Sequence, residues 1–295
     1  MIGLARASGI WLVGALAAAS LAGGVARSQT PPLAPPLTGP IGMVEQPCLP
    51  GSFGRSEAEV ALAEALVSGA TPDPKVMAAY AASAPERAKL DAWREKNDFA
   101  DLCRFRAEDE RLMKQGGVRV VFLGDSITEL WRAADPEFFN DRIVNRGISG
   151  QTSSQLLLRF EQDVIALRPK AVHIMIGTND VAGNNGPERP EDLKNNLRAM
   201  VALAKAQHIG VILAAIPPAS VISWRPAIHP AAQIRDLNAW IAGFAKAQGA
   251  GFVDYGLVLA GPDGGMKPAL TRDGVHPVKA GYELMRPIAQ AAMAR

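Results

Sequence analysis

Residues 118–128 of the 295-residue chain read VRVVFLGDSIT, and this stretch decides how the fold is interpreted. The apolar, β-branched run before Gly124 is typical of a buried strand, and the residues after it begin a helical pattern. Ser126 therefore lies near a helix N-terminus, where backbone amides and the helix dipole favour negative charge. Taken alone, a Gly-Asp-Ser sequence is more often a turn or an N-cap, so the other strand ends must decide its meaning.

Outward from this stretch, short apolar runs alternate with amphipathic segments up to the C-terminus. Such alternation predicts parallel strands joined by helices on both faces of one sheet, and right-handed crossovers leave few topologies. We expect an α/β fold with a doubly wound five-stranded parallel sheet and an N-terminal helical extension. The expected strands are 118–123, 143–145, 171–176, 211–216 and 251–254, and the expected helices are 152–167, 191–208, 234–248 and 279–294.

The carboxyl ends of parallel strands meet at one edge of a sheet, so the residues that follow the strands can form one site. After the second run the chain reads NRGISGQT (145–152), where Gly150 can present a backbone N–H with no side chain in the way. The third run is followed by GTND (177–180), in which Asn179 offers an amide donor. After the fifth run comes DGVH (273–276), and an Asp three residues before a His can fold back to fix the ring tautomer. With the serine after the first run, these groups suffice for acyl transfer.

In these four motifs the chain resembles the SGNH hydrolases, also called the GDSL esterase/lipase family. The motifs follow one another in that family's order, each at a predicted strand end, and the resemblance covers about residue 118 to the C-terminus. It implies a flavodoxin-like hydrolase domain over 116–295. It implies that Ser126 is the nucleophile, His276 the general base and Asp273 the residue that orients the histidine. Ser126, Gly150 and Asn179 would form the oxyanion hole.

The segments before residue 116 have patterns of their own. Residues 1–28 are typical of a secretory signal peptide, with an uncharged apolar centre between two arginines. The alternative is an uncleaved membrane anchor, since such a length can just span about 30 Å of hydrocarbon. Residues 29–50 hold seven prolines and indicate a semi-rigid tether. Residues 51–115 carry helical signals, including the capping-box pattern Ser56-x-x-Glu59, and are expected to form the helical extension.

Two cysteines make one disulfide possible if the protein is exported. Cys48 ends the tether, and Cys103 lies in a stretch, 99–106, with helical spacing. A bridge between them would close a 55-residue loop and stabilise the fold by about 4 kcal/mol in the loop-entropy model. The alternative is two unpaired thiols, with Cys103 acting as a small buried hydrophobe.

Charge and composition exclude several classes. The chain has 31 Lys and Arg against 29 Asp and Glu, and the excess disappears without residues 1–28. No net field then favours nucleic acid or anionic lipid. No HExxH sequence or clustered spacing supports a metal site, so neither a metal nor a cofactor is expected. The expected partner is a small-molecule or glycan ester, with no stable membrane insertion after cleavage; the oligomeric state is not predicted.

We therefore expect a periplasmic or secreted serine esterase. The loop 181–190 is small and polar, which favours short acyl groups and an acetylesterase-like activity, although it could instead be a flexible lid. The alternatives are a lysophospholipase, a thioesterase, or a binding protein that kept the fold without the chemistry.

Several further residues could contribute to the site or to packing. Asp125 and Asp180 are expected to be structural hydrogen-bonding partners, and His173 a satisfied buried histidine. Core packing and substrate contact are equally plausible for three more residues, Trp131, Trp224 and His229.

Overall fold

The computed structural model describes residues 39–40, 42–49 and 55–294. The predicted signal peptide, 1–28, and residues 29–38 of the predicted tether lie outside this part of the chain. Within the described residues, no helix is both long and apolar enough to cross a membrane.

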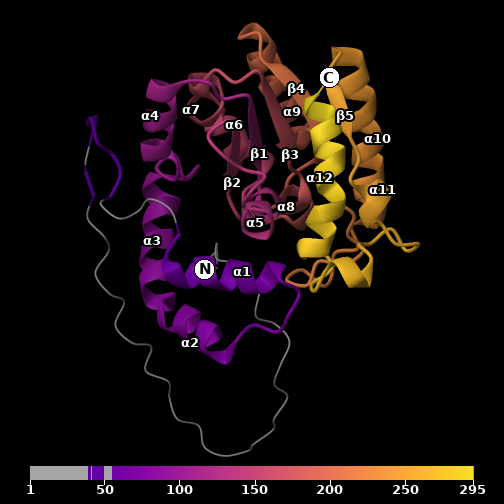
Figure 1. The fold of residues 1–295 in the computed structure, drawn as a ribbon, viewed down its shortest axis with the longest axis horizontal. Helices are drawn as coiled ribbons and strands as arrows, with labels where there is room; N and C mark the ends of the chain where they lie inside the picture. The colour runs from indigo at the N-terminus through magenta and orange to yellow at the C-terminus, as the bar shows by residue number, and fades with distance from the viewer. Residues whose placement is uncertain (1–38, 41, 50–54, 295) are drawn as a thin grey trace, which may run out of the picture.

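The centre of the fold is a five-stranded parallel sheet (Figure 1). Its strands are β1 (Val120–Gly124), β2 (Ile143–Gly147), β3 (Ala171–Met175), β4 (Gly210–Ala214) and β5 (Gly251–Val253), in the order β2-β1-β3-β4-β5. The predicted sheet is thus confirmed, with the strand order of the flavodoxin-like folds. The topological switch point of this order lies between β1 and β3, because the strands are added on one side of β1 and then on the other. Such folds form their ligand sites at the switch point.

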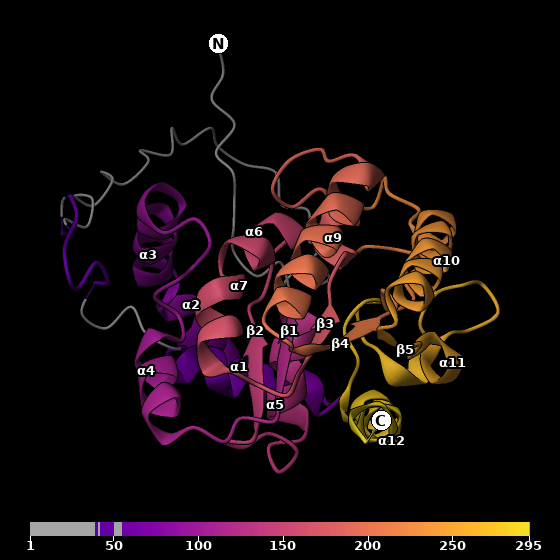
Figure 2. The same cartoon turned by 90° about the horizontal axis from the view of Figure 1, so that it is seen from above.

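Helices cover both faces of the sheet. Figure 2 shows α6, α9 and α10 on one face and α5 and α12 on the other. The helices and helical turns after β1 are α5 (Ser126–Ala134), α6 (Ser153–Leu158), α7 (Phe160–Asp163), η1 (Ile165–Leu167), α8 (Thr178–Ala182), α9 (Pro190–Ala206), α10 (Ala231–Gln248), α11 (Gly256–Leu259), η2 (Pro268–Leu270) and α12 (Lys279–Met293).

Two expected helices are wrong in detail. The segment 152–167 is not one helix, because it breaks at Arg159, whose buried guanidinium donates to the carbonyl oxygens of Gly124 and Arg146 at the strand ends. The stretch 99–106 is a connection of turns, in which the Asp98 carboxylate accepts backbone N–H groups that a helix would use internally.

In the described part of the chain, four helices precede the sheet: α1 (Glu57–Val67), α2 (Pro74–Ala82), α3 (Ala84–Asn97) and α4 (Arg106–Gln115). We call residues 55–115 the N-terminal extension. The expected capping box forms at the start of α1, where the Ser56 side chain and the Glu59 carboxylate satisfy each other's backbone N–H groups. Helix α1 packs against α5, so the N-terminal extension lies against the helix that begins with Ser126.

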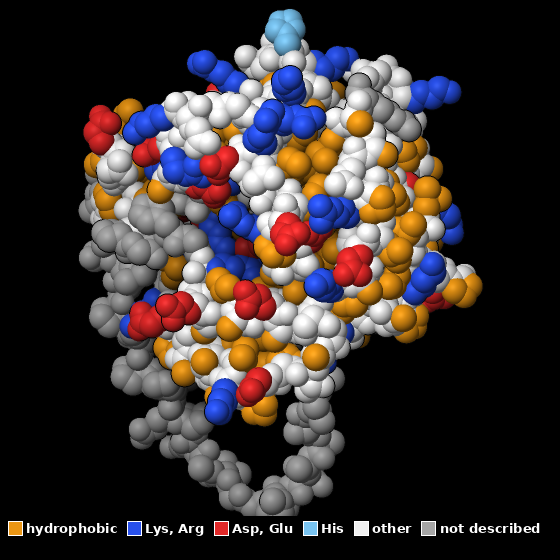
Figure 3. All heavy atoms as spheres, viewed as in Figure 1, with side chains coloured by type: hydrophobic (Ala, Val, Ile, Leu, Met, Phe, Trp, Pro, Cys, Tyr) orange, Lys and Arg blue, Asp and Glu red, His pale blue; other side chains and the backbone are white. Residues whose placement is uncertain are grey.

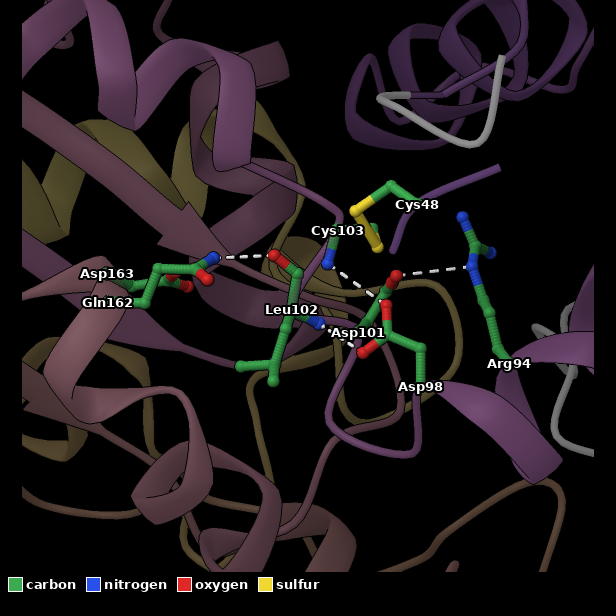
Figure 4. Close-up of a disulfide and its surroundings, with 8 residues drawn as sticks. All are labelled: Cys48, Arg94, Asp98, Asp101, Leu102, Cys103, Gln162 and Asp163. Carbon is green, nitrogen blue, oxygen red and sulfur yellow. Dashed lines mark hydrogen bonds and ion pairs between the residues drawn. A yellow bond between two sulfur atoms is a disulfide. The ribbon is translucent and has the colours of Figure 1, made fainter. Parts of the chain in front are cut away.

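Cys48 and Cys103 form a disulfide, as predicted. The bridge lies with Trp93 in a small apolar cluster separate from the main core. It joins the end of the proline-rich segment to the connection between α3 and α4 (Figure 4).

Candidate active site

The sequence VVFLG forms β1, and the chain turns directly into α5. Asp125 is the N-cap of α5, and its side chain accepts the N–H of Ile127 at 3.0 Å. Ser126 is therefore the first helical residue, and its own N–H has no partner within the helix. The structural hydrogen-bonding role expected of Asp125 is confirmed, and this bond fixes the turn that presents the serine.

Three residues far apart in sequence meet at this turn. The Ser126 Oγ lies 2.8 Å from His276 Nε2, and His276 Nδ1 lies 2.6 Å from the Asp273 Oδ2. The other carboxylate oxygen of Asp273 accepts the backbone N–H groups of Val275 and His276, at 3.0 and 2.8 Å. The DGVH segment thus folds back on itself as expected. In this arrangement the serine hydroxyl can donate to Nε2 while Nδ1–H donates to the carboxylate.

Burial and charge oppose each other at these groups. Burial by itself would lower the pKa of His276, but the Asp273 carboxylate beside the ring raises the pKa above its usual 6.5. Burial likewise acts to raise the pKa of Asp273, and the histidine together with the two backbone N–H groups holds that pKa well below its usual range. Asp125 is fully buried, and burial raises its pKa to about 7. The Asp273 carboxylate, with its lowered pKa, is therefore charged at neutral pH, as a residue that stabilises an imidazolium must be.

The two residues expected to complete an oxyanion hole follow the strands on either side of β1. Asn179 follows β3, neighbour of β1, and its Nδ2 lies 3.0 Å from the Gln151 carbonyl oxygen and 3.4 Å from the Asp125 Oδ2. Gly150 follows β2 on the other side of β1, in a turn with φ of +81° that suits glycine. That loop is anchored beside the serine, because the N–H of Ile148 donates to the carbonyl of Gly124. Three strand ends thus bring their donors to one edge of the sheet.

The orientation of the Asn179 amide is set by residues that the motifs did not include. Asn184 Nδ2 donates to the Asn179 Oδ1 at 2.5 Å, which leaves the Asn179 NH₂ group facing the Gln151 carbonyl and the Asp125 carboxylate. Trp224 Nε1 donates to the Asn184 Oδ1 at 3.0 Å, and the same indole stacks on His276 with ring centroids 5.9 Å apart. Trp224 therefore touches both the histidine and the amide chain behind Asn179. These bonds attach the loop 181–190 to Asn179 and to Trp224.

Burial shows which of the other residues proposed for the site or for packing are core residues. Trp131 is fully buried in the aromatic core, so it is a packing residue, and His229 is exposed. His173 is buried and its Nε2 lies 2.9 Å from the Tyr255 hydroxyl, but its buried Nδ1 has no hydrogen-bond partner among the described residues, so the expected satisfied histidine is satisfied at one nitrogen only. Asp180 accepts the N–H of Ser153 at the start of α6, which confirms its structural role.

Among the residues that the structure describes, no three His, Cys, Asp or Glu side chains gather in a way that could hold a metal ion.

Fold and site together define an α/β protein with a Ser-His-Asp constellation at the carboxyl edge of a parallel sheet. The chain belongs to the GDSL-like lipase/acylhydrolase family, whose family model matches residues 122–284. It is accordingly an ester-hydrolysing enzyme.

Solved structures and curated proteins agree with this assignment. A GDSL-like lipase from Bacteroides thetaiotaomicron is 42% identical with a TM-score of 0.63, over 67% of this chain and 98% of that one. A candidate acylhydrolase from Bacteroides fragilis is 40% identical with a TM-score of 0.64, over 68% of this chain and 98% of that one. An acetylxylan esterase from Geobacillus stearothermophilus is 40% identical over 95 residues, which cover 23% of this chain and 43% of the esterase. The chain thus spans less than half of that curated relative.

Proposed function

We propose that the protein is an exported serine esterase that hydrolyses carboxylic esters of short acyl groups, through Ser126, His276 and Asp273. The observation that carries the proposal is the unbroken pair of contacts, 2.8 Å from the serine to the imidazole and 2.6 Å from the imidazole to the carboxylate. These distances lie within the range required for proton transfer between a nucleophile and its base.

In the proposed reaction, the Ser126 hydroxyl attacks the ester carbonyl and His276 Nε2 accepts its proton. Asp273 holds the ring in the tautomer with a proton on Nδ1 and stabilises the imidazolium that forms. The protonated histidine then gives its proton to the departing alcohol, which leaves an acyl-serine. Water, activated by the same imidazole, releases the acid and restores the serine.

The negative oxygen of each tetrahedral intermediate would be bound by the N–H groups of Ser126 and Gly150 and by the Asn179 side chain. These donors are held before the substrate arrives, which is what makes such donors effective. Removing one donor of this kind costs about 3 to 4 kcal/mol of barrier.

A short acyl group is supported by the space beside the histidine. A hollow lined by Leu66 and Val67 of the N-terminal extension, Leu130 of α5 and His276 encloses about 280 Å³, open solvent included. Within it, the space open to the centre of a water-sized group is only about 20 Å³, so the hollow suits a small group better than a long chain. The similarity to an acetylxylan esterase supports an acetyl group on a carbohydrate as the substrate.

The surface charge supports a partner other than nucleic acid, and the disulfide supports an exported protein. On the face shown in Figure 3, acidic and basic side chains are interspersed with apolar ones, without a broad field of one sign of the kind nucleic acid requires. Export to the periplasm or beyond is supported by the Cys48–Cys103 disulfide, because such bonds persist in oxidising compartments.

The test is a series of p-nitrophenyl esters from acetate to palmitate, with the wild type, Ser126→Ala and Ser154→Ala. Ser154 is a matched control, a nearby serine whose hydroxyl contacts only the Thr152 hydroxyl among the described residues. We expect the rate to be highest with acetate, to disappear in Ser126→Ala and to persist in Ser154→Ala. A maximum at long chains would identify a lysophospholipase-like activity, and hydrolysis retained in Ser126→Ala would refute the mechanism. No hydrolysis by a folded wild type would support a binding protein.

A further inference from the structure

The N-terminal extension lies outside the residues that the family model matches, yet two of its side chains bind Glu129, which holds the residue before Gly150. Gly150 is the middle residue of a turn, and its neighbours Ser149 and Gln151 both contact the N-terminal extension. The direction of the Gly150 N–H depends on how these neighbours are held, because Gly150 itself is exposed and has no side chain.

Ser149 is held through Glu129 of α5. The Glu129 Oε2 accepts the backbone N–H of Ser149 at 2.8 Å and its hydroxyl at 2.5 Å. This carboxylate lies one helical turn after Ser126, so it joins the helix that carries the nucleophile to the turn that carries the second donor. The approach is close, since a Cβ on Gly147 would lie 2.2 Å from the Glu129 N.

Two arginines of the N-terminal extension hold Glu129. Arg55 donates through Nε to the Oε1 at 2.6 Å, and its Nη2 lies 2.5 Å from the Oε2. The same Nη2 donates to the Ser149 hydroxyl at 2.9 Å. Arg104 donates to the Oε1 at 2.7 Å. Side chains of Arg55, Arg104 and Glu129 are all nearly buried, with 13%, 9% and 12% exposed.

The charge state of the cluster follows from this geometry. Burial would raise the pKa of Glu129, but the two arginines and the hydrogen bonds lower it to about 2. Glu129 is therefore an anion throughout the working range of an esterase. A buried anion with two cations and two Ser149 donors has little freedom to reorient.

The connection between α3 and α4 supports the turn from its other side. Gln151 Nε2 donates to the Ala100 carbonyl at 2.8 Å. Figure 4 shows how this connection is fixed: Cys103 is bridged to Cys48, Asp98 accepts the N–H groups of Leu102 and Cys103, and Gln162 donates to the Leu102 carbonyl. Arg104 follows the bridged cysteine directly.

We propose that the N-terminal extension is a positioning element of the active site: Arg55 and Arg104, through Glu129, hold Ser149 so that Gly150 presents its N–H to the oxyanion. The proposal rests on the proposed function, because it assigns Gly150 as an oxyanion donor. Arg55 is the principal positioning residue, since it contacts both Glu129 and Ser149. None of these residues needs to touch the substrate.

The test compares Arg55→Met with Arg111→Met in the full chain. Arg111 is a matched control, an arginine of the N-terminal extension that also binds a carboxylate outside it, Asp141 at 2.7 Å, but on the exposed surface. With p-nitrophenyl acetate, we expect kcat of Arg55→Met to fall about tenfold or more, with KM changed less than about twofold, because the lost interaction belongs to the transition state. Arg111→Met should keep the wild-type kcat.

Two readouts separate positioning from loss of structure. The pH limb of kcat/KM should stay where it is in Arg55→Met, because His276 and Asp273 keep their contacts. Arg55→Lys should recover part of kcat, since an ammonium supplies the charge but not two contacts at once. If Arg55→Met does not fold, Arg55→Lys decides: a kcat between about a half and a tenth of wild type is expected.

Wild-type kcat in folded Arg55→Met or in Arg55→Lys would overturn the proposal, as would an equal loss in Arg111→Met. Ser126→Ala, assayed in parallel, separates this failure from failure of the proposed function. If Ser126→Ala is inactive while Arg55→Met is fully active, only the positioning role is refuted. If Ser126→Ala remains active, the proposed mechanism itself is wrong.

Discussion

Asn179→Ala is the sharpest test of the candidate oxyanion hole. The side chain is nearly buried, and one of its N–H groups is used by the Gln151 carbonyl at 3.0 Å. The contact with the Asp125 Oδ2, at 3.4 Å, is longer than the 2.7–3.2 Å usual for such bonds, so this second N–H can be redirected toward a negative oxygen. The Asn184 amide holds the group in the required orientation.

The expected magnitude follows from the loss of one donor. We expect the barrier to rise by about 3 to 4 kcal/mol, which lowers kcat roughly 10²- to 10³-fold. KM should change little, because the ground-state carbonyl is bound less strongly than the tetrahedral intermediate. Part of the variant's lost stability would come from the Asn184 amide, which loses its acceptor.

The assay measures kcat and KM with p-nitrophenyl acetate. The concentration of active enzyme is determined by titrating the reactive serine with a phosphonate, and thermal unfolding checks that the variant is folded. Asn185→Ala is the matched control, since Asn185 lies in the loop that follows α8 and bonds to the Thr152 hydroxyl, at 3.0 Å, and to the Gln155 side chain instead of to Asn179. A kcat of folded Asn179→Ala within about threefold of wild type would remove Asn179 from the oxyanion hole.

Three further predictions concern titration and crosslinking. Burial acts to lower the pKa of His276, but the Asp273 carboxylate raises it above 6.5. Because the neutral ring is the base, kcat/KM should rise with pH through a limb above pH 6.5. A flat profile from about pH 5 to 9 would contradict this assignment. Replacing Cys48 and Cys103 by serine should lower the free energy of unfolding by up to about 4 kcal/mol in urea titrations, and an unchanged midpoint would refute a stabilising bridge. Burial acts to raise the pKa of Glu129, but the two arginines lower it from 4.5 to about 2. The stability that the ionised Glu129 contributes is therefore complete above pH 4.5 and is lost as the pH falls toward 2. Unfolding measured over that window should show a weaker pH dependence in Glu129→Gln, and identical slopes would exclude Glu129 as a source.

The sequence by itself determined the sheet and the position of its strand ends. Each expected strand is present with its ends shifted by no more than two residues, because a buried parallel strand has a local signature of apolar and β-branched residues. The same holds for the capping box at Ser56 and for the DGVH segment, whose contacts join residues three apart. The pairing of the cysteines needed no topology either, since two cysteines allow one pairing, but whether they are bonded or free thiols was decided by the structure.

Only the tertiary structure decided which side chains support these motifs. Trp224 on His276, Asn184 behind Asn179, and Arg55 on Glu129 join positions that leave no periodic or local trace in the sequence. The break at Arg159 has the same origin, because its guanidinium binds carbonyl oxygens on β1 and β2 in addition to the Asp163 carboxylate nearby in sequence. Local patterns record what neighbouring residues do for one another. Contacts across 74 residues, as between Arg55 and Glu129, exist only once the sheet has brought the strand ends together.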